Sequence, residues 1–214
     1  MKKSIRTGLA AAVLLAGATL MSTSNAVAQG RARVGLKGGL SASSLFYNTQ
    51  GANDKKQRIG FHAGVFSQIP AGEFFAIQPE LLYITKGASA NYNVVGFTGN
   101  NTFKLNYAEL PVLATFKIGE FVEIQAGPYV SYLLNSNLTS NGDFGSGRGA
   151  IVRDNFNNVD YGLAGGLNIY FGKAFIGTRY EQGFQRIANS GAAQTLLGNA
   201  KNAVGLVSIG YSFN

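Results

Sequence analysis

The stretch VEIQAGPYVSYLL, from Val122 to Leu134, alternates between two kinds of side chain with a period of two. One set of alternate positions is apolar and holds Val122, Ile124, Ala126, Pro128, Val130, Tyr132 and Leu134. The other set is polar, small or amphipathic and holds Glu123, Gln125, Gly127, Tyr129 and Ser131. Successive side chains of a β-strand point to opposite faces, so the period predicts a strand with one apolar face and one polar face.

The same period recurs along the chain. Residues 159–171 and 203–213 repeat it clearly, and weaker versions occupy 33–41, 59–66, 75–86, 107–116 and 176–184. The eight segments are candidate strands, and closed bacterial barrels have an even number of strands.

The connections between these segments alternate strictly between short and long. The tight ones carry glycine or proline, as a chain reversal requires, at 69–73, 118–120 and 172–173. The long ones are rich in Asn, Gly and Ser, at 43–56, 88–102, 136–157 and 188–201. Short periplasmic turns and long external loops are typical of outer-membrane barrels. The sequence therefore predicts an all-β protein, an eight-stranded antiparallel up-and-down transmembrane β-barrel.

The N-terminal segment predicts export. Lys2, Lys3 and Arg6 precede an apolar run from Leu9 to Met21, and Ala26-Val27-Ala28 has the small-x-small form of a cleavage site. The apolar run is shorter than the ~20 residues that a membrane-spanning helix needs. We therefore expect a cleavable signal peptide over 1–28 and an outer-membrane β-barrel domain over 29–214.

Composition excludes several other classes. The chain has 29 glycines, 10 tyrosines, 15 phenylalanines and no cysteine, so disulfides and thiolate metal sites are excluded. The formal charge is +8, but Lys55-Lys56-Gln57-Arg58 is the one dense basic run. An exported protein does not normally meet nucleic acid, and we expect no nucleic-acid partner.

Charged residues fall on the polar face of the predicted strands, which would point into the barrel. They are Arg33, Lys37, Glu80, Glu109, Glu123, Asp160, Arg179 and Glu181. An eight-stranded barrel is just wide enough for side chains to fill it, and buried charges must pair or stay hydrated. We expect an interior polar network in which Lys37 and Arg179 face Glu80, Glu109 and Glu181. A charged constriction in a narrow pathway is the alternative, and catalytic carboxylates are a third.

Little in the sequence points to catalysis. His62 is the only histidine, and it shares the inward face with Gly60 and Gly64. No serine is marked as a nucleophile by a neighbouring base. Asn141-Gly142-Asp143 and Arg153-Asp154-Asn155 lack the oxygen-ligand series of a calcium loop. The glycine-rich run 145–149 lies in a predicted loop rather than before a helix. We expect no enzyme activity, no metal and no cofactor.

Aromatic residues near strand ends suit the girdles that mark both membrane interfaces. They are Tyr83, Tyr92, Tyr132, Phe171, Tyr211 and Phe213. Ordinary strand propensity would also place aromatic residues in strands.

Four short motifs resemble the small PorT-type outer-membrane β-barrel proteins of Bacteroidetes, also labelled porin-family barrels. They are IQPELLY at 77–83 with Lys86-Gly87-Ala88, YAELPVL at 107–113, AGPY at 126–129 and RYEQG at 179–183. The resemblance implies an outer-membrane location, a lipid surround and insertion by the barrel-assembly machinery through the C-terminal strand. Most such proteins have no assigned activity. The chain departs from the usual aromatic terminus because Asn214 follows Phe213.

Three functions are compatible with this reading. The first is a structural or interaction barrel acting through its long external loops, especially 136–157, on envelope or extracellular proteins. The second is a narrow channel for small solutes, and the third is an accessory barrel of a secretion or envelope-assembly system. Width argues against a general porin, because wide aqueous channels need about sixteen strands or more. The competing fold is a soluble exported barrel with its apolar face inward and a lipid in its lumen.

Overall fold

The computed structural model describes residues 32–46, 55–94, 97–142, 147–149, 157–187 and 201–214. The predicted signal peptide and nearly all of the predicted loop 188–201 lie outside these residues. Within this described part, no helix is long and apolar enough to cross a bilayer.

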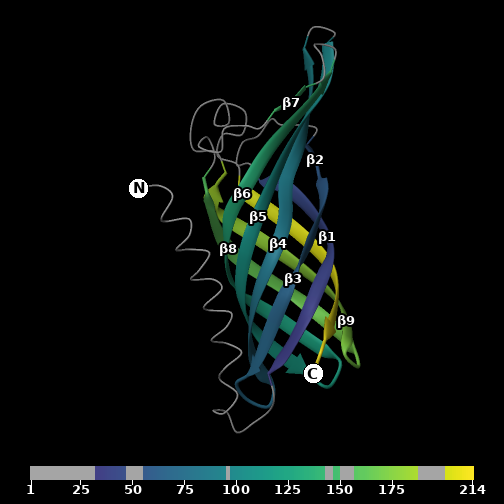
Figure 1. Cartoon of the computed structure of the whole chain (residues 1–214), viewed down its shortest axis with the longest axis vertical. Coiled ribbons are helices and arrows are strands. Elements are labelled where there is room, and N and C mark those ends of the chain that lie inside the picture. Colours follow the sequence, from purple (N-terminus) through teal and green to yellow (C-terminus); the bar gives the residue numbers. More distant parts are fainter. Residues whose placement is uncertain (1–31, 47–54, 95–96, 143–146, 150–156, 188–200) are drawn as a thin grey trace. The chain divides into compact units, whose positions relative to one another are not determined.

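Every element of the described chain is a β-strand (Figure 1). The long strands are β1 (Arg33–Phe46), β3 (Arg58–Pro70), β4 (Phe75–Val94), β5 (Phe97–Ile118), β6 (Val122–Gly142), β8 (Val159–Phe171), β9 (Ala174–Arg186) and β10 (Lys201–Ser212). Two short strands, β2 (Lys55–Lys56) and β7 (Gly147–Gly149), pair with β4 and β6. The eight long strands confirm the predicted strand segments.

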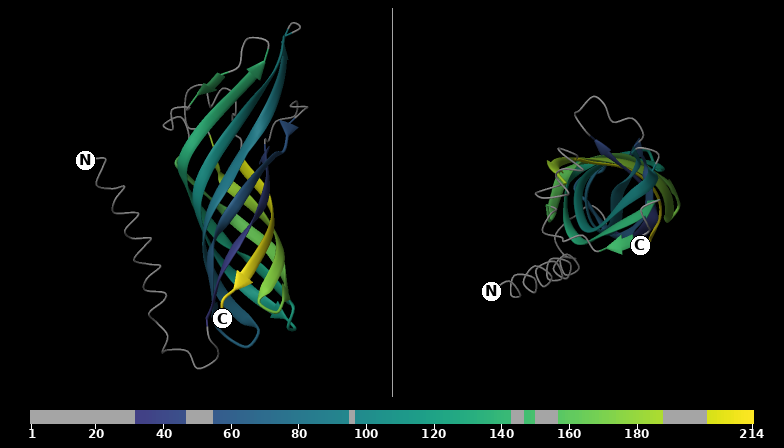
Figure 2. Two further views of the ribbon diagram at one scale, coloured as in Figure 1. Left: turned by 45° about the vertical axis from the view of Figure 1, so that its right-hand side comes forward. Right: turned by 90° about the horizontal axis from the view of Figure 1, so that it is seen from above.

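Each long strand pairs antiparallel with its neighbours in the chain, and the ring closes between the first strand and the last. The closing register runs from Gly35 opposite Ser212 to Phe46 opposite Lys201. Figure 2, seen from above, shows the strands as a continuous ring. The structure therefore confirms the closed eight-stranded antiparallel barrel, which leaves no open edge around the ring.

The tight turns lie at the same end of the barrel as both ends of the described chain. Gly119 and Gly172 have φ values of 64° and 67°, in the left-handed region that glycine adopts without strain. At this end the side chain of Asn214 joins the two strands of the closing seam. Its Oδ1 accepts a hydrogen bond from the backbone N–H of Val34 at 2.9 Å, and its Nδ2 donates to the carbonyl of Ala32 at 2.6 Å.

Three of the predicted loops are too long. The segment 88–102 is not a loop, because β4 and β5 stay paired as far as Val94 opposite Phe97. The first residues of 136–157 also continue β6, which pairs with β5 as far as Gly142. Strand β1 likewise reaches Phe46, inside the predicted loop 43–56. In Figure 1 the paired β4, β5 and β6 rise past the ends of the other strands.

The apolar face points outward. Most large apolar residues at the predicted outer positions are exposed, for example Leu163 at 53% and Ile209 at 69%. Near the tight turns the exposed side chains are mainly phenylalanines: Phe74, Phe75, Phe116, Phe121, Phe171 and Phe213. This ring fits the aromatic girdle of a membrane interface. The side chain of Tyr92, which the prediction included, lies outside the described side chains. The reversed-face, lumen-binding fold is wrong for this chain.

Candidate functional site

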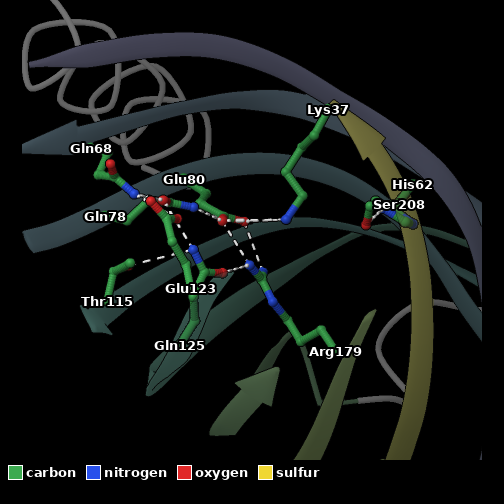
Figure 3. A network of polar contacts seen from close by, with 10 residues as sticks. All are labelled: Lys37, His62, Gln68, Gln78, Glu80, Thr115, Glu123, Gln125, Arg179 and Ser208. Atoms are coloured by element: carbon green, nitrogen blue, oxygen red, sulfur yellow. Dashed lines mark hydrogen bonds and ion pairs between the residues drawn. The ribbon is translucent and has the colours of Figure 1, made fainter. Parts of the chain in front are cut away.

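Two charge clusters lie inside the barrel, and the first is centred on Glu80. Its Oε1 accepts a hydrogen bond from Nη2 of Arg179 at 2.7 Å, and its Oε2 accepts from Nη1 at 2.8 Å. Lys37 reaches the same carboxylate from the other side, with Nζ 3.2 Å from Oε2. Figure 3 shows the three side chains converging from β1, β4 and β9. The paired contact of Arg179 is the planar two-bond geometry that fixes a guanidinium against a carboxylate.

Amides satisfy the rest of this cluster. Gln78 donates to Glu80 Oε1 at 2.7 Å, and Gln125 Oε1 accepts from Arg179 Nη2 at 3.2 Å (Figure 3). Gln68 joins Gln78 to Glu123 through hydrogen bonds of 3.1 and 2.9 Å. These connected donors and acceptors replace the water that a buried ion pair loses.

The second cluster is centred on Lys86, which is completely buried. Its Nζ lies 2.6 Å from Glu109, 3.5 Å from Glu181 and 3.7 Å from Asp160. The ring of Tyr129 lies beneath the ammonium, with its centroid 4.5 Å from Nζ. The aromatic face adds a cation–π contact to the three carboxylates.

Further hydrogen bonds fix the carboxylates of this cluster. Ser131 donates to Glu109 Oε2 at 2.6 Å, and Asn202 donates to Asp160 Oδ2 at 2.9 Å. Tyr129 also reaches Asp160 Oδ2, at 3.3 Å. Glu80, Glu109 and Asp160 are therefore each held by more than one partner.

The five residues of the expected network are all buried inside the barrel, Glu80 meets the two expected cations, and the other two acids meet a different one. Lys37 and Arg179 both bind Glu80, whereas Glu109 and Glu181 lie against Lys86. Lys86 was missing from the predicted set. The sequence does indicate its position, because Lys86 is an even number of residues from Glu80 on β4 and so points to the same inner face.

Aromatic side chains fill the lumen near the tight turns. Phe66, Phe175 and Tyr170 form a buried cluster. The ring centroid of Phe175 lies 5.6 Å from that of Phe66 and 5.0 Å from that of Tyr170. Arg33 lies over the Tyr170 ring, 5.4 Å from its centroid. Phe66 is paired with Glu80 across β3 and β4, so the aromatic cluster borders the Glu80 cluster.

His62 has one hydrogen-bonded partner in the described structure. Its Nε2 lies 2.9 Å from Oγ of Ser208, and both residues are buried (Figure 3). Among the described side chains, no carboxylate hydrogen-bonds to its other ring nitrogen, Nδ1. A nucleophile also needs access to substrate, and the burial of Ser208 gives none.

The interior holds its charges in fixed pairs that are shielded from solvent. Glu80, Lys86, Glu109 and Glu181 are each at most 3% exposed. Removing one partner of such a pair leaves the other charge buried, unpaired and away from water. Strands that are far apart in the sequence therefore depend on one another for the pairing of their buried charges.

An antiparallel ring with an apolar outer face and a filled, charged interior defines a small transmembrane barrel of the bacterial outer membrane. Residues 22–189 match the model of the outer membrane protein beta-barrel domain family. The chain belongs to this family, and it is an integral protein of the outer membrane.

Solved structures of other small barrels are similar at low identity. Ail, the attachment invasion locus protein of Yersinia pestis, is 15% identical, with a TM-score of 0.47 over 86% of this chain and 100% of that chain. Neisserial surface protein A is 10% identical, with a TM-score of 0.49 over 85% and 97%. OprG from Pseudomonas aeruginosa is 13% identical, with a TM-score of 0.43 over 86% and 97%. No curated protein matches the chain.

Proposed function

We propose that the protein is an interaction barrel whose working surface is the part of β4, β5 and β6 that extends beyond the ring. The observation that carries the proposal is the unequal length of the strands. These three have 20, 22 and 21 residues, whereas the other long strands have 12 to 14.

The extra length lies outside the membrane. About nine to eleven tilted residues cross the hydrocarbon layer, so roughly ten residues of each long strand remain beyond it. At about 3.3 Å per residue, they measure on the order of 30 Å along the strand. The β4–β5 register is continuous from Leu82 opposite Glu109 to Val94 opposite Phe97, so this part is an ordered hairpin. An ordered sheet projecting from a cell surface suits contact with other molecules.

The interior clusters have a structural role in this proposal. Lys37, Glu80, Arg179, Lys86, Glu109 and Glu181 bind strands to one another across the lumen. The narrow-channel alternative requires an aqueous path past these pairs and past Phe66 and Phe175. Burial of all these side chains favours the interaction barrel.

Several finer assignments belong to the same proposal. The segment 1–28 directs export and is cleaved, and the C-terminal strand is read by the barrel-assembly machinery. The motifs at 77–88, 107–113, 126–129 and 179–183 support the PorT-type resemblance, and the protein has no catalytic activity. Membership of a secretion or envelope-assembly system is the remaining alternative, and cross-linking distinguishes it.

The absence of cysteine from the sequence makes the projecting hairpin directly testable. Thr98→Cys places a single thiol on the hairpin, and Gly72→Cys places one in a tight turn at the other end. We expect a membrane-impermeant maleimide to label Thr98→Cys on intact cells, and Gly72→Cys only after lysis. The opposite pattern would invert the orientation. Thiol cross-linking from Thr98→Cys should then yield adducts with extracellular proteins, whereas adducts solely with a secretion apparatus would favour the accessory role.

Single-channel recording tests the competing function. Purified barrels in planar bilayers should give no steady conductance steps. Reproducible steps that change in Glu80→Gln would overturn the interaction proposal in favour of the channel.

A further inference from the structure

Two cations lie directly opposite each other at the external end of the barrel. Arg186 ends β9, Lys201 begins β10, and the two are antiparallel partners beside a register shift, since the next paired residue of β10, Ala203, lies opposite Gln182. Opposed residues in an antiparallel pair have Cβ atoms about 5 Å apart, and like charges at this spacing are destabilising. The sheet therefore holds an unfavourable pair unless an anion lies between or beside the two.

Both side chains point outward, toward the lipid side of the barrel. Along β9, alternate residues from Phe175 to Gly183 are buried inside, so Arg186 falls on the outer parity and is exposed. Along β10, Asn202 turns inward to bind Asp160, so its neighbour Lys201 turns outward. The pair is thus directed away from the two charge clusters of the lumen.

The described residues include no acidic partner for this pair. Within the described residues, no carboxylate lies within 4.0 Å of either cation. The chain that joins the two strands, residues 188–200, has no acidic residue in its sequence. The backbone of Arg186 is nevertheless fixed, because its carbonyl accepts a hydrogen bond from Nδ2 of Asn157 at 2.7 Å.

Aromatic residues lie on the membrane side of the pair. Tyr180 and Phe184 are 52% and 45% exposed on the same outer face of β9. The Tyr180 hydroxyl donates to Oε1 of Gln182 at 2.8 Å, and Phe184 is the next outward-facing residue before Arg186. Apolar rings below and two cations above match an amphiphile with acyl chains and a phosphate at the interface.

We propose that Arg186 and Lys201 bind a phosphate of a phosphorylated lipid in the outer leaflet. The anion neutralises the repulsion between the two side chains, and the acyl chains lie against Tyr180 and Phe184. The site rests on the membrane location of the barrel and is independent of what the projecting hairpin contacts. It supplies a lipid contact at the external end of the barrel, where β9 ends and β10 begins.

The test is a binding titration of the folded, detergent-solubilised protein with a fluorescent phosphorylated lipid A. Each cation near an anionic headgroup contributes about five-fold in affinity, so the Arg186→Gln/Lys201→Gln double variant should bind about 25-fold more weakly. Lys173→Gln, in a tight turn at the opposite end, is the matched control and should bind as the wild type does. Arg186→Lys keeps the charge and should retain most of the affinity.

The lipid source is distinguished by two further probes. Lipid A without its phosphates should bind weakly to the wild type, and inorganic phosphate at the same concentration should not displace the fluorescent lipid. Equal affinity of the double variant and the wild type would overturn the site, provided that both shift in mobility on unheated gels. Displacement by equimolar inorganic phosphate would overturn the lipid as the ligand.

Discussion

Lys86 Nζ lies 2.6 Å from Glu109 Oε2, and both side chains are completely buried. The two residues are on adjacent strands, yet the ammonium also faces Glu181 and Asp160 from the far wall. One cation thus neighbours three carboxylates. Its removal should therefore destabilise the fold more than the removal of any single acid around it.

Lys86→Met should destabilise the barrel by about 3–5 kcal/mol, because it leaves the carboxylates without their cation. The urea midpoint of the mobility shift on unheated gels measures this change. Lys104→Met, on the outer face of β5, is the control and should change stability by less than about 0.5 kcal/mol. A Lys86→Met barrel as stable as the wild type would mean that the three acids are held by other means.

A double-mutant cycle on Arg179 and Glu80 should show strong coupling. Each single variant, Arg179→Met or Glu80→Gln, leaves a buried charge without its partner. The double variant leaves fewer such unpaired charges. The interaction term should be about 1–3 kcal/mol, measured by the same urea titration. Additive effects would contradict the paired contact between the guanidinium and the carboxylate.

Gly39→Ala should impair folding, whereas Gly165→Ala should not. A methyl group at Gly39 would collide with the carbonyl oxygen of Val207 on the neighbouring strand β10, and backbone cannot move aside cheaply. At Gly165 the nearest atom to such a methyl is 3.8 Å away. We expect a loss of about 1–3 kcal/mol at Gly39 alone, measured as folded yield in vesicles and as urea midpoint.

Leu167→Lys tests the outward face. Leu167 lies near the middle of β8 and is 39% exposed toward lipid. A lysine at the midplane should cost about 2–4 kcal/mol in vesicles. If the variant loses no stability in lipid, this face does not meet the hydrocarbon layer.

Asn214→Ala removes both hydrogen bonds that join the closing strands at the seam. Each such bond contributes about 0.5–1.5 kcal/mol, and exposure places these at the low end, so a loss of about 1 kcal/mol is expected. Asn214→Asp keeps the acceptor to the N–H of Val34 and should recover part of it. Refolding into vesicles, followed by gel mobility, reports the difference.

The membrane-spanning part of the fold could be predicted from the sequence because each strand there meets lipid on one side and polar side chains on the other. Beyond the membrane no lipid selects apolar residues for one face, so the sequence there need not alternate. The segment 88–102, rich in Asn and Gly, was therefore predicted as a loop although most of it is a paired hairpin.

The pairing inside the lumen could not be predicted for a different reason. The alternation along each strand places Lys37, Glu80 and Glu181 on the inner face. Which cation meets which acid, however, depends on how far the strands are staggered around the ring. The stagger brings Arg179 to the level of Glu80 and leaves Glu181 to Lys86. No local pattern in a single strand records that offset.

The inward charges also bear on how the chain reaches its membrane. Lys37, Glu80, Glu109, Asp160 and Arg179 each fall within a different strand. An ionised residue at the centre of a would-be helix costs about 2.5–3.5 kcal/mol on insertion through a translocon. We therefore expect the side chains that bind the finished barrel together also to disfavour insertion of these five segments into the inner membrane as helices during the proposed export.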